Sequence, residues 1–568
     1  MGLNGALQIG RSAMLSSQAA ISVAGNNMAN AATPGYHRQL AGLSPSRSSP
    51  IGRNQFVGTG VGLASINRAI DSALQSRLRD AISDQNSATI DERFLSAIES
   101  IQNELTDNDL SSKISAFFNA FSELANNPLD NAVRTVVVQQ GVSLTDHLNL
   151  LRDQYGTLRE EADRALSVSV QRADGLLDEI AALNSQISMA EGGAGGSGGG
   201  ANSLRDRRDQ LIDELSNFIE VDTVEQQNGS IDILVGSIPV VLAGESRGLT
   251  MRTQNGANGS EVSIRVREDG STLDIRSGSI GALQQQREET ILPAMETIDE
   301  FASQLAFQVN SAHSQGQGLH HRTEAIGTVT GIDATESLNA DASGVPWEVR
   351  NGVFQLHVVD SSTGLRDTYQ VAIDPENMSL QDLVDRINVE LGVTDATASI
   401  GPSGEFRITA DAGHEIAFSD DSSGVLAALG VNGFFTGSNA AEIRVDQALL
   451  DDPSLLATSA DFTSGGNSIA LQIVELENAS LPGFNGRSLR EQWQTSVNSL
   501  AVRTGAAQNK LESSHLVRES LEAQNQAVSG VSIDEEAIDL MTLQRQFQAA
   551  ARFISVIDET MQVLLSIA

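Results

Sequence analysis

The C-terminal stretch IDEEAIDLMTLQRQFQAAARFISVIDETMQVLLSIA, residues 533–568, carries the pattern that decides the fold. Apolar residues recur every seven positions in two rows, the second interrupted only by Glu536. The first row is Ile533, Leu540, Phe547, Ile554, Met561 and Ala568, and the second is Leu543, Ala550, Ile557 and Leu564. Ser532 and Glu535 have the spacing of a capping box, which starts a helix by satisfying its first N–H groups. The stretch predicts a long amphipathic helix with a coiled-coil-like seam.

A matching pattern lies at the other end of the chain. Large apolar residues recur every seven positions, and a small residue follows each of them three positions later. The large row is Leu7, Met14, Ile21 and Met28, and the small row is Gly10, Ser17, Ala24 and Ala31. The helix should end before Pro34, which has no N–H and disfavours helical geometry at Thr33.

The two terminal helices have complementary faces and opposite charge. Residues 1–60 contain four arginines and no acid, whereas residues 521–568 contain seven acids and two arginines. Burying one apolar face does not offset the entropy lost in ordering a lone terminal helix. We therefore expect the two helices to pair and to form an assembly interface. The residues expected there are Leu7, Met14, Ile21, Met28, Leu540, Leu543, Phe547, Ile554, Ile557, Met561 and Leu564.

The middle of the chain predicts a mainly helical protein with β-rich insertions. Helical spacing is expected over Ile66–Ile101, Leu110–Leu124, Val133–Met189, Leu204–Phe218, Ala282–Ala312, 466–478 and 487–526. Residues 37–65 predict an extended connector, Gly192–Gly200 a flexible loop, and Ile219–Ile280 short strands. Residues 320–445 predict an α+β insert with strands at Val353–Val359, Tyr369–Ile373 and Phe406–Ile408, and a short helix capped by Ser379.

These patterns predict a multidomain chain of three parts. Residues 1–65 with 521–568 form a terminal helical inner domain. Residues 66–319 with 446–520 form a helical middle domain with a β-rich part near 219–280. Residues 320–445 form an outer α+β domain. A chain of 568 residues is too long for one hydrophobic core, which agrees with several domains.

Composition excludes several classes of function. The formal net charge of −37 argues against nucleic acid and anionic membranes as partners, because both require clustered Lys and Arg. No cysteine is present, so disulfides and thiolate chemistry are excluded. No apolar run is long enough for membrane insertion, and the N-terminus lacks the compact apolar region of a cleaved secretory signal.

No motif predicts catalysis, a cofactor or a metal site. The G-x-S-x-G pattern at Gly195–Gly199 and Gly244–Gly248 lacks the strand-to-helix context of a nucleophile elbow, so we interpret both matches as coincidence. His320-His321 has no third ligand nearby, which favours a solvated loop. Asp107-Asn108-Asp109 and Asp420-Asp421 do not continue into a calcium loop, which favours turn or capping roles.

Two segments resemble a known family. Asn26, Asn27, Ala29, Asn30, Thr33, Pro34, Gly35 and Tyr36 belong to the stretch NNMANAATPGY, which resembles the motif of bacterial flagellar rod, hook and hook-associated proteins. The stretch SGVSIDEE at 529–536 is similar to the start of their common C-terminal helix. Leu204–Leu211, after a glycine-rich loop, is similar to a segment of the hook-associated members. Met28, His37 and Phe547 depart from the residues common at those positions.

The resemblance implies a structural subunit at the junction between hook and filament, outside the cell. It also implies type III export without signal cleavage, an export chaperone on the C-terminal helix, self-association in a ring, and contacts with adjacent hook and filament-side junction proteins. Two alternatives stay open: another axial protein of the hook or distal rod, and a secreted coiled-coil adhesin that uses the acidic insert. An enzyme is the least favoured class.

Overall fold

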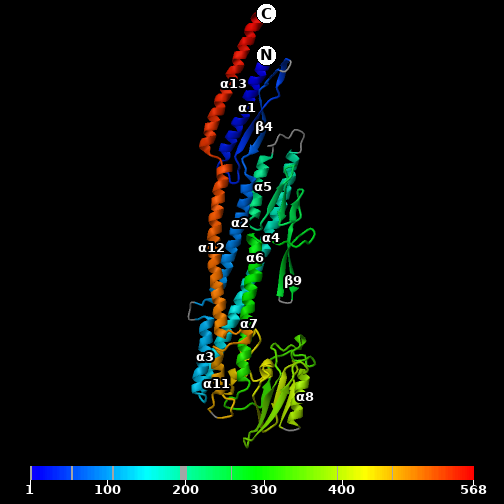
Figure 1. Cartoon of the computed structure of the whole chain (residues 1–568), viewed down its shortest axis with the longest axis vertical. Helices are drawn as coiled ribbons and strands as arrows, with labels where there is room; N and C mark the ends of the chain where they lie inside the picture. Colours follow the sequence, from blue (N-terminus) through cyan, green and yellow to red (C-terminus); the bar gives the residue numbers. More distant parts are fainter. Residues whose placement is uncertain are drawn as a thin grey trace. The chain divides into compact units, whose positions relative to one another are not determined.

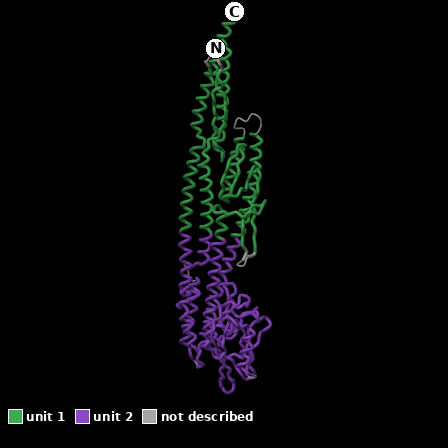
Figure 2. Tube along the Cα trace, turned by 45° about the vertical axis from the view of Figure 1, so that its right-hand side comes forward, with its two compact units in different colours: residues 1–93, 162–286, 506–568 green, residues 94–161, 287–505 purple. Residues whose placement is uncertain are grey.

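The computed structural model describes residues 3–52, 55–104, 108–191, 201–256, 259–392, 395–463 and 465–567. The chain divides into two compact units (Figure 2). The first comprises residues 1–93, 162–286 and 506–568, and the second comprises residues 94–161 and 287–505. The helices α2 (Ser72–Gln102), α4 (Asn131–Glu191) and α12 (Leu489–Ser529) contribute residues to both units. The three-part domain scheme stays a prediction. Its Gly192–Gly200 loop, the first G-x-S-x-G match, Asp107 and Ala568 lie outside the described residues.

The first unit is built on its terminal helices. α1 (Leu3–Asn30) and α13 (Ile533–Ile567) lie side by side, with both chain ends at the same end of the pair (Figure 1). The remaining helices confined to this unit are α5 (Asn202–Leu215) and α6 (Gly278–Gln286). α12 packs on α2 through a buried cluster of Leu74, Leu78, Ala81, Ile82 and Leu521.

The strands of the first unit form antiparallel hairpins and one four-stranded sheet. β1 (Gln39–Pro45) pairs with β4 (Val61–Arg68), and β2 (Ser49–Gly52) pairs with β3 (Gln55–Val57). The four-stranded sheet contains β5 (Asp222–Glu225), β6 (Ile231–Val235), β7 (Ile238–Leu242) and β8 (Glu245–Ser246) in that order. β9 (Leu249–Gly256) and β10 (Gly259–Val266) form a separate hairpin.

The second unit contains a helical part. Its helices are α3 (Leu110–Asn126), a π-helical turn (Arg287–Ile291) that leads into α7 (Leu292–His313), α8 (Leu380–Leu391), α9 (Val425–Ala428), α10 (Gln447–Asp451) and α11 (Ser468–Leu476). Short 3₁₀ turns occur at Asp341–Ser343, Pro453–Leu455 and Pro482–Phe484. The helical part is stabilised by a cluster of T-shaped and tilted rings, in which Phe117 contacts Phe121, Phe434 and Phe435.

The second unit also contains two three-stranded antiparallel sheets. One has the order β13 (Arg366–Ile373), β12 (Gly352–Asp360), β16 (His414–Ser419), and the other β11 (Glu324–Ile326), β15 (Phe406–Ala410), β14 (Ala396–Ile400). β17 (Phe435–Thr436) and β18 (Arg444–Val445) form a further short pair. α8 presents Leu380, Leu383 and Ile387 to the core, and Ser379 and Asp382 close its capping box.

Some predicted boundaries are wrong for local reasons. The helix expected from Ile66 begins at Ser72, because residues up to Arg68 complete β4 and Asp71 accepts hydrogen bonds from the N–H groups of Ala73 and Leu74. The connector expected over residues 37–65 is extended, but it also folds back as hairpins. Ser12 and Ser16 of α1 hydrogen-bond the backbone of Val61, so β4 lies against that helix.

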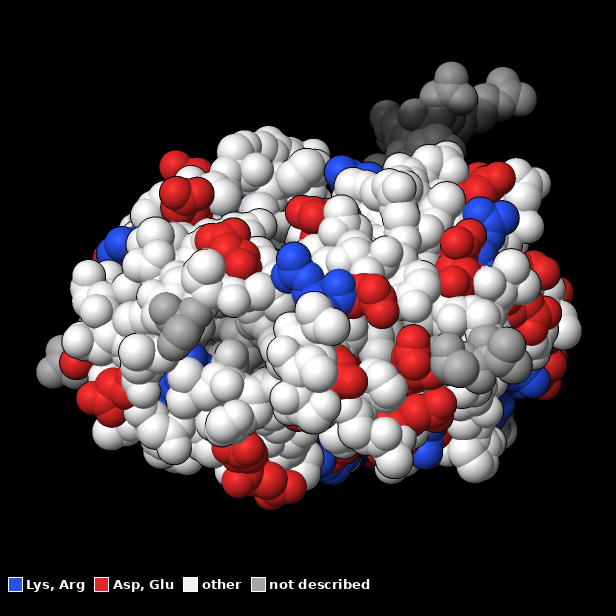
Figure 3. Space-filling view, turned by 90° about the horizontal axis from the view of Figure 1, so that it is seen from below, with Lys and Arg blue, Asp and Glu red and all other residues white. Residues whose placement is uncertain are grey.

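Within the described residues, no helix is long and apolar enough to cross a membrane. On the face drawn in Figure 3, acidic side chains are spread among uncharged ones, with a few basic groups between them. That face therefore carries dispersed negative charge instead of one continuous acidic patch.

Candidate functional site: the terminal helix pair and its polar clasp

The terminal helices contact one another through the row of small residues on α1. Gly10, Ser17 and Ala24 are buried, whereas Leu7, Met14, Ile21 and Met28 are half-buried. A Cβ atom at Gly10 would lie 2.7 Å from Cγ1 of Ile554, which is closer than real side chains approach. The absence of a side chain at Gly10 therefore lets α13 approach α1 at Ile554.

The predicted interface residues of α13 differ in exposure. Ala550 and Ile557 are buried, Leu540, Leu543, Phe547, Ile554 and Met561 are half-buried, and Leu564 is 53% exposed. Further large apolar side chains of α13 are exposed outside the two predicted rows: Ile538, Met541, Phe553, Val556 and Val563. A single copy of the chain therefore leaves apolar surface on several sides of this helix.

Glu536, which interrupts the apolar row, is the centre of a polar clasp between the termini. Its side chain is buried, with the whole residue 2% exposed. The Arg38 Nε–H donates to Glu536 Oε1 at 2.7 Å, and the Asn27 amide donates to Glu536 Oε2 at 3.1 Å. The Arg38 backbone N–H donates to the carbonyl oxygen of Ser529 at 2.9 Å. We call Asn27, Arg38 and Glu536 the clasp.

Asn27 also holds the turn that follows α1. Its side chain donates to the Gln39 carbonyl and accepts from the Gln39 N–H, each at 2.9 Å. The Tyr36 hydroxyl donates to the side-chain oxygens of both Asn26 and Asn27 at 2.9 Å. Burial, followed by the charges of Asp206 and Glu536, raises the pKa of Tyr36 to about 12, so this hydroxyl stays protonated.

Part of the motif forms the exposed tip of this turn, namely Thr33, Pro34 and Gly35. Ala29 is exposed in the last turn of α1. Gly35 has a φ of +70°, and a Cβ there would overlap the side chain of Gln210, which donates to the Pro34 carbonyl. A glycine therefore suits this position both for its backbone angle and for its contact with α5.

Ser532 and Glu535, the two residues of the predicted capping box, make different contacts at the start of α13. The Ser532 hydroxyl accepts from the Glu535 N–H at 3.4 Å. The Glu535 carboxylate lies 3.3 Å from Arg38 Nη1, and it is exposed. Glu535 thus extends the clasp at its solvent edge, in addition to its position in the first turn of the helix.

A buried ion network connects the turn to α2 and α5. His37 Nδ1 and Arg68 Nη1 each lie 2.8 Å from Asp206 Oδ1, and Arg68 also donates to Asp209 at 2.6 Å. Arg79 of α2 lies 3.4 Å from Asp209. Burial alone would raise the pKa of Asp209, but the guanidinium groups of Arg68 and Arg79 bring it below its ordinary value. Asp209 therefore stays ionised within the network.

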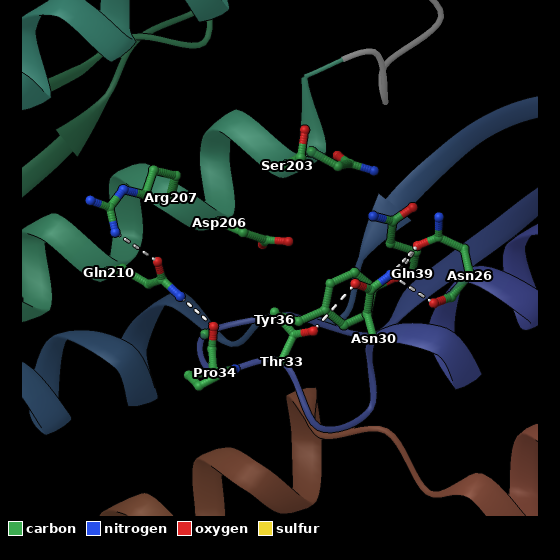
Figure 4. A pocket seen from close by; sticks show the side chains of 12 residues that line it. Asn26, Asn30, Thr33, Pro34, Tyr36, Gln39, Ser203, Asp206, Arg207 and Gln210 are labelled. Atoms are coloured by element: carbon green, nitrogen blue, oxygen red, sulfur yellow. Dashed lines mark hydrogen bonds between the residues drawn. The ribbon is translucent and has the colours of Figure 1, made fainter.

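A pocket of about 420 Å³ opens between the turn and the start of α5. Asp206 extends from α5 toward the side of the pocket formed by Asn26, Asn30 and Tyr36 (Figure 4). Asp206 is 6% exposed, and its Oδ2 atom is buried without a hydrogen-bond partner. The rest of the lining is also polar, with Ser203, Arg207 and Gln210 on the α5 side.

Three family models match the chain, and together they cover both terminal helices. The model described as the flagellar hook-associated protein FlgK helical domain matches residues 95–326. The flagella basal body rod protein model matches residues 7–37, and the flagellar basal body rod FlgEFG protein C-terminal model matches residues 523–567.

Full-length relatives decide the assignment. Flagellar hook-associated protein 1 of Escherichia coli strain K12 is 23% identical over 98% of both chains, and that of Salmonella typhimurium strain LT2 is 24% identical over the same shares. Flagellar hook-associated protein 1 of Bacillus subtilis strain 168 is 23% identical over 99% of this chain and 97% of its own. The chain therefore resembles flagellar hook-associated protein 1 along nearly its whole length.

A solved structure has the same fold. The flagellar hook junction protein FlgK from Burkholderia pseudomallei covers 80% of this chain and 100% of its own, with a TM-score of 0.50 and 16% identity. The similarity to hook-associated protein 1 over nearly the whole chain confirms the expected flagellar, extracellular location and favours the hook-associated interpretation over the hook, rod and adhesin alternatives.

The other motifs take part in the local structure of the chain. Ser246 lies in β8, which leads to the strand β9 and not to a helix. Asp109 accepts from the Ser112 N–H as the N-cap of α3, and Asp421 accepts from the N–H groups of Ser423 and Gly424. The ring centroid of His321 lies 6.0 Å from that of Phe462. No group of three potential metal ligands occurs in the part of the chain that the structure describes.

Sequence reasoning missed most of the clasp. It identified Asn27 only through the motif and treated Glu536 as an interruption. Arg38 was counted only as part of the basic N-terminal region, and Asp206 only as part of a similar segment. The buried charge at a seam position was the available signal, because such a carboxylate needs a cationic partner.

Proposed function

We propose that this chain is the structural, non-enzymatic subunit that connects hook and filament in the bacterial flagellum. The observation that carries the proposal is the clasped pair of α1 and α13, joined to a chain that matches its hook-associated relatives over nearly their whole length. The protein with the similar solved structure is itself a flagellar hook junction protein, which agrees with the same role.

The terminal pair is the polymerisation element in this proposal. In one copy the apolar side chains of Ile538, Val556 and Val563 remain in water, on a helix whose other face already contacts α1. Removing such side chains from water contributes on the order of 1.5–3 kcal/mol each. Packing against neighbouring copies in a ring would bury them. The same pair forms a coiled-coil-like inner domain, and residues 320–445 form the outer domain.

The C-terminal helix has a second partner before assembly. Its exposed apolar residues would expose the monomer to aggregation, so we infer that an export chaperone covers α13 until the chain leaves the cell through a type III route. After export, the neighbours are the hook below and a junction protein on the filament side. Nucleic acid and the membrane are not partners in this proposal.

Deletion of the gene tests the role. The deletion strain should build hooks that carry no filament, and plasmid-borne wild-type protein should restore filaments. Electron microscopy of cells grown in parallel measures both results. Filaments of normal length and number on the deletion strain would contradict the proposal.

A further inference from the structure

The pocket between the turn and α5 contains an unmet hydrogen-bonding requirement. Asp206 Oδ1 is occupied by His37 and Arg68, but Asp206 Oδ2 is buried and has no partner. An unpaired buried carboxylate oxygen costs free energy that a donor would recover. The pocket, at about 420 Å³, has room for a side chain from outside.

The neighbouring groups favour a donor that can contact several acceptors. The side-chain oxygens of Asn26 and Asn30 line the pocket on the side that Asp206 faces (Figure 4). A guanidinium group has five N–H donors in a planar arrangement and no acceptor, so it can bind a carboxylate oxygen and amide oxygens together. An arginine side chain therefore fits the lining better than a group with one N–H.

The terminal helices carry arginines that lack a partner within the described residues. Arg11 is the only basic residue of α1, and Arg545 and Arg552 are the only basic residues of α13. All three side chains are exposed, and none makes a hydrogen bond or ion pair in the described part of the chain. No acid lies three or four positions from any of them, so none can pair along its own helix.

We propose that the pocket receives an arginine of a second copy of this chain, Arg11, Arg545 or Arg552, whose guanidinium group binds Asp206 Oδ2. The inference rests on the proposed ring. It deepens that proposal by specifying one contact between subunits: an arginine of one terminal helix pair enters the polar pocket of the next copy and binds Asp206. The lining holds one acid, Asp206, and one base, Arg207, so the argument for this occupant is the unpartnered Asp206 Oδ2 and not the net charge of the pocket. The three arginines are donors that have no partner of their own within the described residues.

Site-specific cross-linking tests the contact in assembled flagella. The chain contains no cysteine, so the introduced thiols are the only ones on this protein. Cells produce one copy with Ser203→Cys, at the exposed edge of the pocket, and a second copy with Arg11→Cys, Arg545→Cys or Arg552→Cys. A short bismaleimide should link one of the three pairs into a covalent dimer in isolated flagella. Asp274→Cys, at an exposed residue outside the pocket lining, replaces Ser203→Cys in the control and should give no dimer.

Blocking the pocket provides an independent measurement. Ser203→Trp fills the opening and leaves the buried ion network unchanged, whereas Ser203→Ala keeps the pocket open. The Trp variant should weaken the contact between two copies at least about tenfold, the factor that corresponds to one hydrogen bond to a charged group. It should therefore reduce the number of filament-bearing hooks. The Ala variant should behave as wild type.

The outcomes separate this contact from the ring itself. Absence of wild-type protein from the hook tip would refute the proposed function. Wild-type protein at the tip with no dimer from any of the three pairs, or with normal filament numbers for Ser203→Trp, would overturn the arginine contact alone.

Discussion

Glu536 shows how a single residue can connect the two ends of the chain. It lies in the seam of α13, where an apolar residue is expected, and it accepts hydrogen bonds from Arg38 and Asn27. A buried carboxylate at such a position favours one register, because a shift along the helix would leave it unpaired. The clasp therefore sets how α13 lies against α1.

The clasp can be tested by Glu536→Ala. We expect the free energy of separating α13 from α1 to fall by about 3 kcal/mol, since Arg38 and Asn27 lose a buried acceptor. Hydrogen exchange of the α13 backbone amides in the purified full chain measures the change.

Glu535→Ala is the matched control for Glu536→Ala. The Glu535 side chain is exposed, so its pair with Arg38 contributes at most about 1 kcal/mol. Equal exchange rates in the two variants would mean that the buried carboxylate has no special role.

At the scale of elements, α1 and α13 form an unequal pair of helices. α1 presents small residues toward its partner, and α13 presents larger ones. The periodicity predicted a helix at each end of the chain, because a seven-residue spacing follows from helix geometry alone. The interface residues expected on the two helices stay a prediction. It did not predict the hairpin of β1 and β4, whose packing on α1 depends on serine hydroxyls that bond the backbone of Val61.

Two glycines of α1, Gly10 and Gly25, differ in the space around them, so substitutions at the two positions should have opposite effects on stability. Gly10→Val should destabilise the pair by about 1–3 kcal/mol, since its side chain would overlap Ile554. Gly25→Ala, where a Cβ meets no neighbour, should stabilise α1 by roughly 0.5–1 kcal/mol through helix propensity. Thermal unfolding of the full chain, followed by helical circular dichroism, compares the two.

Substitutions at Ile554 and Phe547 test whether the half-buried face of α13 is needed for filament assembly. Ile554→Asp or Phe547→Asp places a charge on the half-buried face of α13 and should abolish filament formation. Because either variant could also lose its chaperone, filaments are counted only in cultures in which the exported protein is detected in the medium. Gln546→Asp, on an exposed polar position with no arginine three or four residues away, should assemble normally. Wild-type filaments with Ile554→Asp would refute the proposed helix face.

At the scale of the whole molecule, the sequence predicted the fold class of the chain better than its individual strands and buried side-chain contacts. A mainly helical protein with β-rich insertions is observed, and the family assignment agrees with the motif at residues 26–36. The short strands β11, β14 and β16 were missed, because three to six residues carry little periodicity. The network of Asp206 with His37 and Arg68 could not be predicted, since its members lie far apart along the chain.

The second unit should lose stability in mild acid. Burial lowers the pKa of His313 to about 4, and the neutral ring donates to the Asn432 carbonyl and accepts from the Ala457 N–H. Burial also lowers the pKa of His357 to about 4. The unfolded chain binds these protons near pH 6.5, so stability is complete above that pH and falls as the pH decreases toward 4.

His313→Gln isolates the contribution of one ring to this pH dependence. For His313, the free energy of unfolding should fall by on the order of 3 kcal/mol between pH 6.5 and 4. The glutamine offers a donor and an acceptor without titrating. Its unfolding free energy, measured by denaturant titration across this range, should therefore depend less steeply on pH than that of the wild type. Equal slopes would show that the buried ring does not control the acid response.

Immunogold labelling of intact flagella tests the central claim most directly, namely that this chain forms a ring through its clasped terminal helices at the junction of hook and filament. An antibody against the full chain, applied to wild-type cells, should label a single narrow band at the distal end of the hook. The deletion strain should show no label. Label along the entire hook, along the filament, or over the cell surface would contradict the account.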